Sequence, residues 1–76
     1  MLIKDAVQVI LEQEEMTRTE LAVELDITPG MLSHYTNHSH HPRLGLAAKI
    51  WGKYRVQVEP YTVLALDTEY ERQTDG

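Results

Sequence analysis

The chain of 76 residues is long enough for one small domain, near the lower limit at which an apolar core alone stabilises a fold. It contains no cysteine, which excludes disulfides and thiolate metal ligands. Its formal net charge is −5, from 7 Lys and Arg against 12 Asp and Glu. No apolar run approaches the roughly 18 residues of a membrane span, and the charged N-terminus does not resemble a signal peptide. We therefore expect a soluble cytoplasmic protein without a membrane partner.

The charge is distributed unevenly along the sequence. Residues 1–26 carry 2 basic and 7 acidic residues, residues 27–58 carry 4 basic residues and no acid, and residues 59–76 carry 1 basic and 5 acidic residues. All four histidines lie in the middle block. A local surface decides whether phosphates are attracted, because charges more than about 8 Å apart are largely screened. The middle block is therefore where we expect an anionic partner to bind.

The first 26 residues predict two helices. The stretch "LIKDAVQVILEQEE" has apolar residues at the spacing of one helix face, with acids on the remaining positions. In "MTRTELAVEL", Thr17 and Glu20 have the spacing of a capping box, in which each side chain bonds the other residue's backbone N–H. The residues predicted to point inward are Ile3, Ala6, Val7, Ile10, Leu11, Leu21, Ala22 and Leu25.

The stretch "DITPGMLSHYTN" predicts a third helix over residues 28–37. Thr28 is a good N-cap residue, and Pro29 at the first helical position loses only an N–H that had no partner. Leu32 and Tyr35 have the spacing of inward-pointing residues, and Ile27 is expected to reach the core from the turn before the helix. Two short helices joined so closely are the helix-turn-helix arrangement.

A histidine-rich loop, "HSHHP", separates this region from a fourth predicted helix in "RLGLAAKIWGKYR". In that helix Gly45 and Gly52 each weaken the helical state, by about 1 kcal/mol against alanine at a mid-helix position. Its side chains available to the core are Leu44, Ala47, Ile50 or Trp51, and Tyr54.

The last twenty residues are ambiguous from sequence. Val56 and Val58 alternate as in a strand, whereas Glu59-Pro60 is typical of a helix start. We favour a fifth helix, with Tyr61, Leu64 or Ala65, and Thr68 at helical spacing. The predicted fold is an all-α bundle of five short helices forming one domain over residues 1–72, with a disordered tail at residues 73–76.

An ordered set of residues in the second and third predicted helices resembles the lambda-repressor/Cro-like helix-turn-helix proteins, also called the XRE family. The residues in register are Glu20-Leu21-Ala22, Ile27-Thr28, Leu32-Ser33, Tyr35, Asn37 and Pro42. The resemblance covers roughly residues 2–66, and the family includes small repressors of bacteriophages, plasmids and mobile elements and many antitoxins. The chain departs from the family pattern twice, with Asp26 where glycine is usual and His38 where the pattern reads Asn-Gly.

This resemblance implies a set of DNA contacts. In the family the second helix of the motif lies in the major groove, and its N-terminal residues meet base edges. Carried over by position, the base contacts are Pro29, Gly30, Ser33 and His34. The implied phosphate contacts are Arg18, Thr28, Asn37, His38 and Arg43. Lys49, Lys53 and Arg55 are expected to be ordinary solvated charges.

A single short helix with few donors reads DNA weakly, so we expect a homodimer. Two copies on a palindromic operator would bridge half-sites one helical turn, about 34 Å, apart. The dimer interface is expected in the C-terminal segment, at Tyr61, Val63, Leu66 and Tyr70, although these residues could equally be part of the core.

The histidines of "HYTNHSHHP", residues 34–42, raise the question of a metal site. A helix that ends near Asn37 would not hold His34 and His38 on one face, and the adjacent His40 and His41 would diverge in an extended loop. No cysteine, Asp or Glu in residues 27–58 completes a ligand set. We therefore expect no metal and no cofactor. The histidines are better explained as neighbours of phosphates, with an affinity for DNA that rises as the pH falls from about 8 to 6.

The sequence thus predicts a sequence-specific DNA-binding transcriptional regulator, a repressor of the Cro/CI type, in a bacterial or phage-infected cell. No Ser/His/Asp order, glycine-rich phosphate loop or carboxylate pair indicates an enzyme. Two alternatives remain. One is an antitoxin that binds a toxin and autoregulates its promoter. The other is a helix-turn-helix protein that binds only protein, such as an anti-repressor.

Overall fold

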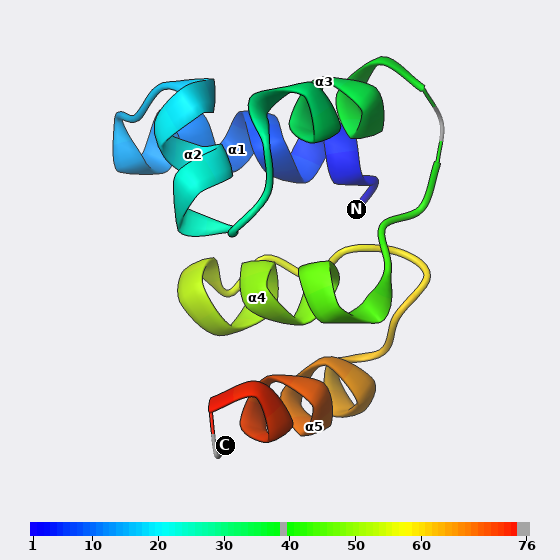
Figure 1. Cartoon of the computed structure of the whole chain (residues 1–76). Helices are drawn as coiled ribbons and strands as arrows, with labels where there is room; N and C mark the ends of the chain where they lie inside the picture. Colours follow the sequence, from blue (N-terminus) through cyan, green and yellow to red (C-terminus); the bar gives the residue numbers. More distant parts are fainter. Residues whose placement is uncertain (39, 75–76) are drawn as a thin grey trace.

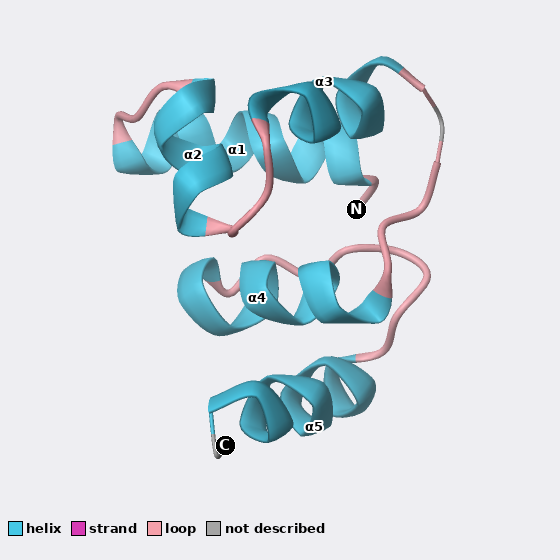
Figure 2. Ribbon diagram, viewed as in Figure 1, coloured by secondary structure: helices cyan, strands magenta, loops and turns pink. Residues whose placement is uncertain are grey.

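The computed structural model describes residues 1–38 and 40–74. They form five helices, and no strand occurs among them (Figure 2). The prediction of an all-α fold with five short helices is confirmed. The helices are α1 (Ile3–Glu14), α2 (Arg18–Glu24), α3 (Pro29–Asn37), α4 (Leu44–Tyr54) and α5 (Val63–Thr74).

The helices are arranged in two groups around a common core (Figure 1). Helix α3 packs on α1 and α2, while α5 lies along α4 on the side away from α1. None of these helices is long and apolar enough to cross a membrane. In α1 to α4 the core is made mostly by the side chains predicted from helical spacing, whereas Pro42, Val56, Val58 and Leu66 join it without having been predicted in this way. Its fully buried large members are Val7, Ile10, Leu21, Leu25, Leu32, Pro42, Ile50, Val58 and Leu66.

Two predicted caps determine where α2 and α3 begin. The Thr17 hydroxyl oxygen accepts the Glu20 N–H at 3.2 Å, and the Glu20 carboxylate accepts the Thr17 N–H at 3.0 Å. Hydrogen bonding of the Glu20 carboxylate to Thr17, first to its backbone N–H and then to its side chain, favours the charged form and lowers the pKa of Glu20. The Thr28 hydroxyl oxygen accepts the Met31 N–H at 3.1 Å, with Pro29 in the first turn as predicted.

The turn between these helices requires a left-handed residue. Asp26 has a φ of 59°, a conformation that glycine adopts freely and most other residues only at a cost. Asp26 occupies the position where the resembled family usually has glycine. Its carboxylate also lies 3.9 Å from the Lys49 ammonium group.

The segment between α4 and α5 differs from what the sequence predicted. Val56 and Val58 do alternate into the core, but from an extended loop rather than a strand. Helix α5 begins at Val63 instead of Glu59-Pro60, because the Thr62 hydroxyl caps it by accepting the Ala65 N–H at 3.2 Å. The inward position of α5 is therefore Leu66, which is fully buried.

The other expectations for α5 change in consequence. Leu64 or Ala65, and Thr68, are expected at the inward spacing, but Leu64 is 76% exposed, Thr68 is exposed and Ala65 is only half-buried. Gln73 and Thr74, predicted to be disordered, belong to the last turn of α5. The Gln73 side-chain amide donates to the Gly45 carbonyl oxygen at 2.8 Å, which ties the end of α5 to the start of α4. Residues 75 and 76 of the predicted tail lie outside the described residues.

Helices α4 and α5 approach each other closely at Gly52. A Cβ atom at this position would lie 2.3 Å from carbons of the Tyr70 ring, so only glycine leaves room for the ring. The neighbouring residue of α4, Trp51, donates its indole N–H to the carboxylate of Asp67, about one helical turn before Tyr70 in α5, at 2.5 Å. The Arg55 guanidinium group lies over the Trp51 ring, 5.2 Å from its centre, and 3.6 Å from the same carboxylate. The helix stability lost at Gly52 is thus offset by the packing of the Tyr70 ring that this glycine allows.

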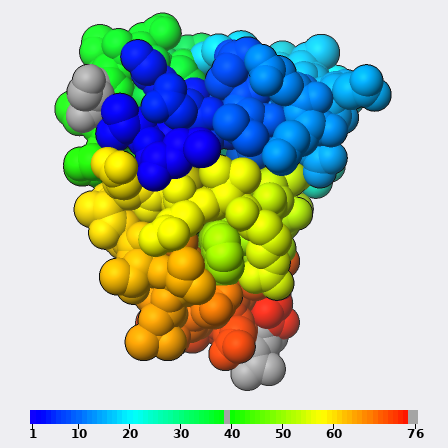
Figure 3. Space-filling view, turned by 180° about the vertical axis from the view of Figure 1, so that it is seen from behind, coloured from blue at the N-terminus to red at the C-terminus, as the bar shows by residue number. Residues whose placement is uncertain are grey.

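The N-terminus is held against the segment that joins α4 and α5. The Met1 amino group lies 3.4 Å from the Glu59 carboxylate, and the Glu59 N–H donates to the Met1 carbonyl oxygen at 2.8 Å. Figure 3 shows the first residues, in dark blue, in contact with the yellow surface of this segment. The start of α1 is therefore fixed relative to α4.

The two glycines of α4 should respond oppositely to alanine. In Gly52→Ala the new methyl group would meet the Tyr70 ring, and overpacking of this kind costs about 1–3 kcal/mol. Gly45→Ala is the matched control, because its Cβ meets only the Gln73 amide nitrogen at 3.5 Å. It should be neutral or stabilise by up to about 1 kcal/mol. Chemical unfolding followed by circular dichroism measures both, and a Gly52→Ala protein as stable as Gly45→Ala would contradict the close packing.

The left-handed turn predicts a second pair of stability effects. Asp26→Gly and Asp26→Ala both remove the carboxylate that faces Lys49, so their difference reports the backbone alone. Because alanine is strained at positive φ, the glycine variant should be the more stable by about 1 kcal/mol. Equal unfolding free energies for the two variants would show that Asp26 is not held in this conformation in solution.

Candidate functional site

Helix α3 exposes almost its entire length. Leu32 is its only fully buried residue. Of the predicted base contacts, Pro29, Gly30 and His34 are exposed and Ser33 is half-buried. A Cβ atom at Gly30 would meet only the Thr28 hydroxyl at 3.8 Å, so nothing in the chain fills the space beside the first turn. The first turn of α3 is therefore open to a large partner.

A hollow of about 270 Å³ lies where α1, the start of α2 and the end of α3 meet. We call it the three-helix hollow. It brings together Arg18 and Asn37, which the sequence analysis assigned to phosphates separately. The Arg18 guanidinium donates to the Thr36 hydroxyl oxygen, and that hydroxyl donates to the Ser33 carbonyl oxygen at 3.1 Å. The remaining lining residues are Lys4, Asp5, Val7 and Gln8.

Lys4 and Thr36 are polar residues of this hollow that the sequence analysis missed. Lys4 belongs to the acidic first block, so a charge count along the sequence concealed it. Its position beside Arg18 depends on how α1 packs against α3, for which the sequence carries no local signal.

Arg43 borders a different side of α3. It lines a largely apolar hollow of about 380 Å³ together with Met31 and Tyr35 of α3 and Leu46 of α4. The residue stands at the N-cap position of α4, directly after Pro42, and is exposed. Arg43 thus lies beside Met31 and Tyr35 of α3, whereas the three-helix hollow lies beside Thr36 and Asn37.

The structure changes which cations are available to a partner. Four of the seven Lys and Arg side chains face a carboxylate: Lys49 with Asp26 at 3.9 Å, Lys53 with Glu24 at 3.4 Å, Arg55 with Asp67 at 3.6 Å, and Arg72 with Glu69 at 3.5 Å.

The positive charge of residues 27–58, which contain no acid of their own, is therefore largely neutralised by acids from other parts of the chain. Acids from α2, from the turn after it and from α5 pair with three of its four cations. Lys4, Arg18 and Arg43 have no carboxylate within 4.0 Å in the part of the chain that the structure describes. All three border α3.

Three histidine rings gather at the end of α3. The His38 N–H donates to the His34 carbonyl oxygen at 3.1 Å, which keeps His38 one helical turn beyond His34. Their ring centres are 4.8 Å apart, and the His40 ring stacks on His34 with centres 5.0 Å apart. Helix α3 ends at Asn37, as expected, and His38 has an extended backbone. The expectation that this helix end would separate the two rings is nevertheless wrong, because their centres are close.

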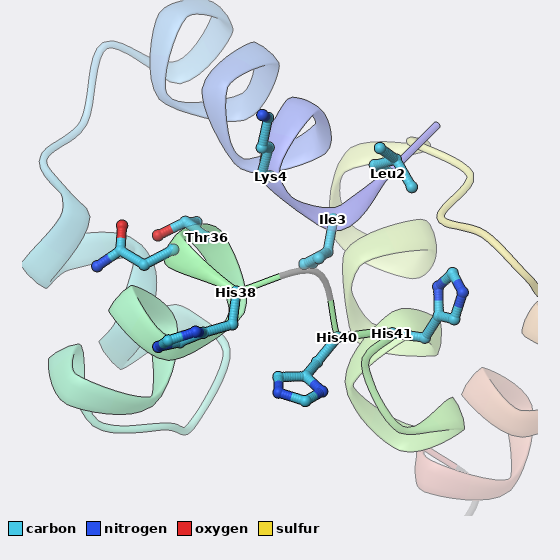
Figure 4. Close-up of a pocket in the computed structure, with 8 residues that line it drawn as sticks. Leu2, Ile3, Lys4, Thr36, His38, His40 and His41 are labelled. Carbon is cyan, nitrogen blue, oxygen red and sulfur yellow. The ribbon is translucent and has the colours of Figure 1, made fainter.

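His41 does not join this group. Figure 4 shows the His38 and His40 rings on one side of the loop and the His41 ring on the other, around a small hollow that Ile3 and Leu2 also line. Among the described residues, no three His, Asp or Glu side chains are grouped in a way that would enclose a metal ion.

The predicted dimer interface needs correction. Leu66 is fully buried within its own chain. The Tyr61 hydroxyl donates to the Pro42 carbonyl oxygen at 2.7 Å, and the Tyr70 ring packs against Gly52. These three side chains are engaged within the monomer: Leu66 and Tyr70 of α5 pack toward the core and α4, and Tyr61, in the segment before α5, bonds the loop before α4. Of the predicted set only Val63 keeps a substantially exposed apolar side chain, next to the still more exposed Leu64.

Comparisons of the chain with models of protein families, with curated proteins and with solved structures found no match.

Proposed function

We propose that this protein is a sequence-specific DNA-binding transcriptional regulator of the Cro/lambda-repressor type, with α2 and α3 as a helix-turn-helix and α3 as the helix that enters the major groove. The observation that carries the proposal is the charge pattern. The three cations without a carboxylate partner, Lys4, Arg18 and Arg43, all border α3. A polyanion is the partner that such a surface attracts.

The shape of α3 suits a groove. Its first turn carries Pro29 and Gly30, which leave the backbone accessible, and its next exposed turn carries His34. Sequence discrimination would come from hydrogen bonds of His34 and Ser33 with base edges and from apolar contact of Pro29 with a thymine methyl group. Few donors take part, so each half-site is read modestly.

The phosphate contacts would lie on both sides of this helix. Arg18, Asn37 and Lys4 in the three-helix hollow would hold one strand, and Arg43 would face the other across a major groove about 12 Å wide. Such contacts position the protein without reading sequence. Thr28 and His38 remain proposed phosphate contacts, since both are exposed at the two ends of α3.

Modest discrimination by one helix favours a dimer on a palindromic site. After the correction above, we place the contact between copies at Val63 and Leu64, the exposed apolar residues that begin α5. A protein that binds only another protein remains the alternative, and the absence of any DNA complex even at low salt would favour it.

Cation variants test the proposed phosphate contacts. We expect weaker DNA binding in each of three variants, Lys4→Gln, Arg18→Gln and Arg43→Gln, on a DNA fragment that flanks the protein's own gene. Each variant should also reduce the slope of log K against log salt by about 1. Fluorescence anisotropy at several salt concentrations measures both quantities. Lys53→Gln is the control with the same charge change, because Lys53 already faces Glu24. An equal loss in the control would show that only net charge matters.

A second test addresses the base contacts. His34→Ala should relax the preference at one base position, and Gly30→Gln should create a new preference for adenine, each worth about 1–3 kcal/mol at that position. Selection from a randomised DNA library reads out both changes. Val23→Gln on the exposed surface of α2 serves as the control. If His34→Ala and Gly30→Gln select the same sequence as the unaltered protein, α3 does not contact bases at these positions.

A further inference from the structure

The histidine rings at the end of α3 have an arrangement that DNA binding does not require. His34 lies in the last turn of α3, and His38 is the C-cap residue, whose backbone is extended and whose N–H still donates to the His34 carbonyl oxygen at 3.1 Å. Their ring centres lie 4.8 Å apart with the planes inclined at 44°. Zinc sites use histidines four residues apart when their rings come together on one side of the chain, and here the measured distance between the rings brings them together.

We propose that His34 and His38 bind one divalent transition-metal ion of the zinc and nickel class. Imidazole nitrogen bonds to zinc at about 2.0–2.1 Å, and rings at this spacing can each direct a nitrogen to a shared ion between them. Both side chains are exposed, so the ion reaches them without any opening of the fold. Water fills its remaining coordination positions, because no third His, Asp or Glu in the described residues encloses the site.

His40 has a different part in this arrangement. Its ring is stacked on His34, with centres 5.0 Å apart and planes inclined at only 15°. Stacking covers the face of the His34 ring, whereas the nitrogens that donate to a metal lie in the ring plane at its edge. His40 therefore supports the orientation of His34 and is not a ligand.

The chemistry of the pair selects among cations. Imidazole is a borderline ligand that suits zinc, nickel and copper, whereas magnesium and calcium prefer oxygen donors. Among the described residues no Asp or Glu side chain is grouped with the two rings, so no carboxylate is there to attract a hard cation. The site should therefore discriminate strongly against magnesium.

Occupancy of this site has a consequence that rests on the proposed function. His34 is also the proposed base contact, so an ion that engages its ring withdraws it from the major groove. Zinc or nickel would then lower the affinity for DNA. The binding of the ion itself does not depend on DNA and is tested without it.

The experiment is titration calorimetry of the full chain with zinc chloride and with nickel chloride, in a buffer that does not bind metals, and with magnesium chloride as the negative control. One ion should bind per chain, with displaced resonances of the His34 and His38 rings in NMR spectra. His34→Ala and His38→Ala should each lower the affinity for zinc about 100-fold. Once one histidine holds the ion, the other is kept close to it by the same chain and so acts at a high effective concentration, which each variant loses. Circular dichroism verifies that the variants fold.

His41→Ala is the matched control, since His41 lies in the same loop but outside the ring cluster, and it should leave the affinity unchanged. His40→Ala should retain binding. No binding of zinc or nickel, or an equal loss in His41→Ala and His34→Ala, overturns the proposal. A protein that binds zinc but not DNA refutes the proposed function alone, and one that binds DNA but not zinc refutes this inference alone.

Discussion

The attachment of α3 to the rest of the molecule by a single fully buried side chain, Leu32, is the constraint on which the surface of this protein depends. One buried anchor, together with the cap at Thr28, sets the rotation of the helix about its axis and its starting point. Every other position of α3 is therefore partly or fully at the surface. Helices α1 and α2 both contact α3, and their apolar residues belong to the same core as Leu32. A helix held in this way is well suited to be inserted into a partner.

Packing also redistributes the charge of the chain. Acids from α2, from the α2–α3 turn and from α5 neutralise three cations of the middle block, although that block has no acid of its own. What remains unneutralised is a set of cations from three distant parts of the sequence: Lys4, Arg18 and Arg43. The cations without a carboxylate within 4.0 Å thus gather around α3 in a chain whose net charge is −5. Salt screens distant charges, so a bound partner responds mainly to the charges close to it.

The contact between α4 and α5 determines what the C-terminal part can offer. The Tyr70 ring occupies the space above Gly52, and Asp67 is engaged by Trp51 and Arg55. These contacts hold Tyr70, the aromatic residue of α5, against α4 within the monomer. Val63 and Leu64 are left exposed at its first turn, which confines any apolar contact with a second copy to that end of the helix.

The sequence by itself determined the first four helices, the caps at Thr17 and Thr28, the left-handed tolerance at Asp26 and most of the core. These features depend on residues within four positions of one another, whose hydrogen bonds and side-chain spacing are local. The resemblance to a helix-turn-helix family supplied Arg18, Asn37 and Arg43 as candidate site residues. Only the tertiary structure decided where α5 begins, that Val56 and Val58 fill the core from a loop, that Lys4 joins Arg18, and that His34 and His38 meet. The places of Lys4, Val56 and Val58 depend on which distant segments pack together, and that is settled by the burial of apolar surface across the whole chain. The start of α5 and the meeting of His34 and His38 depend on the local backbone at Thr62 and at the C-cap of α3, which the residue pattern did not specify.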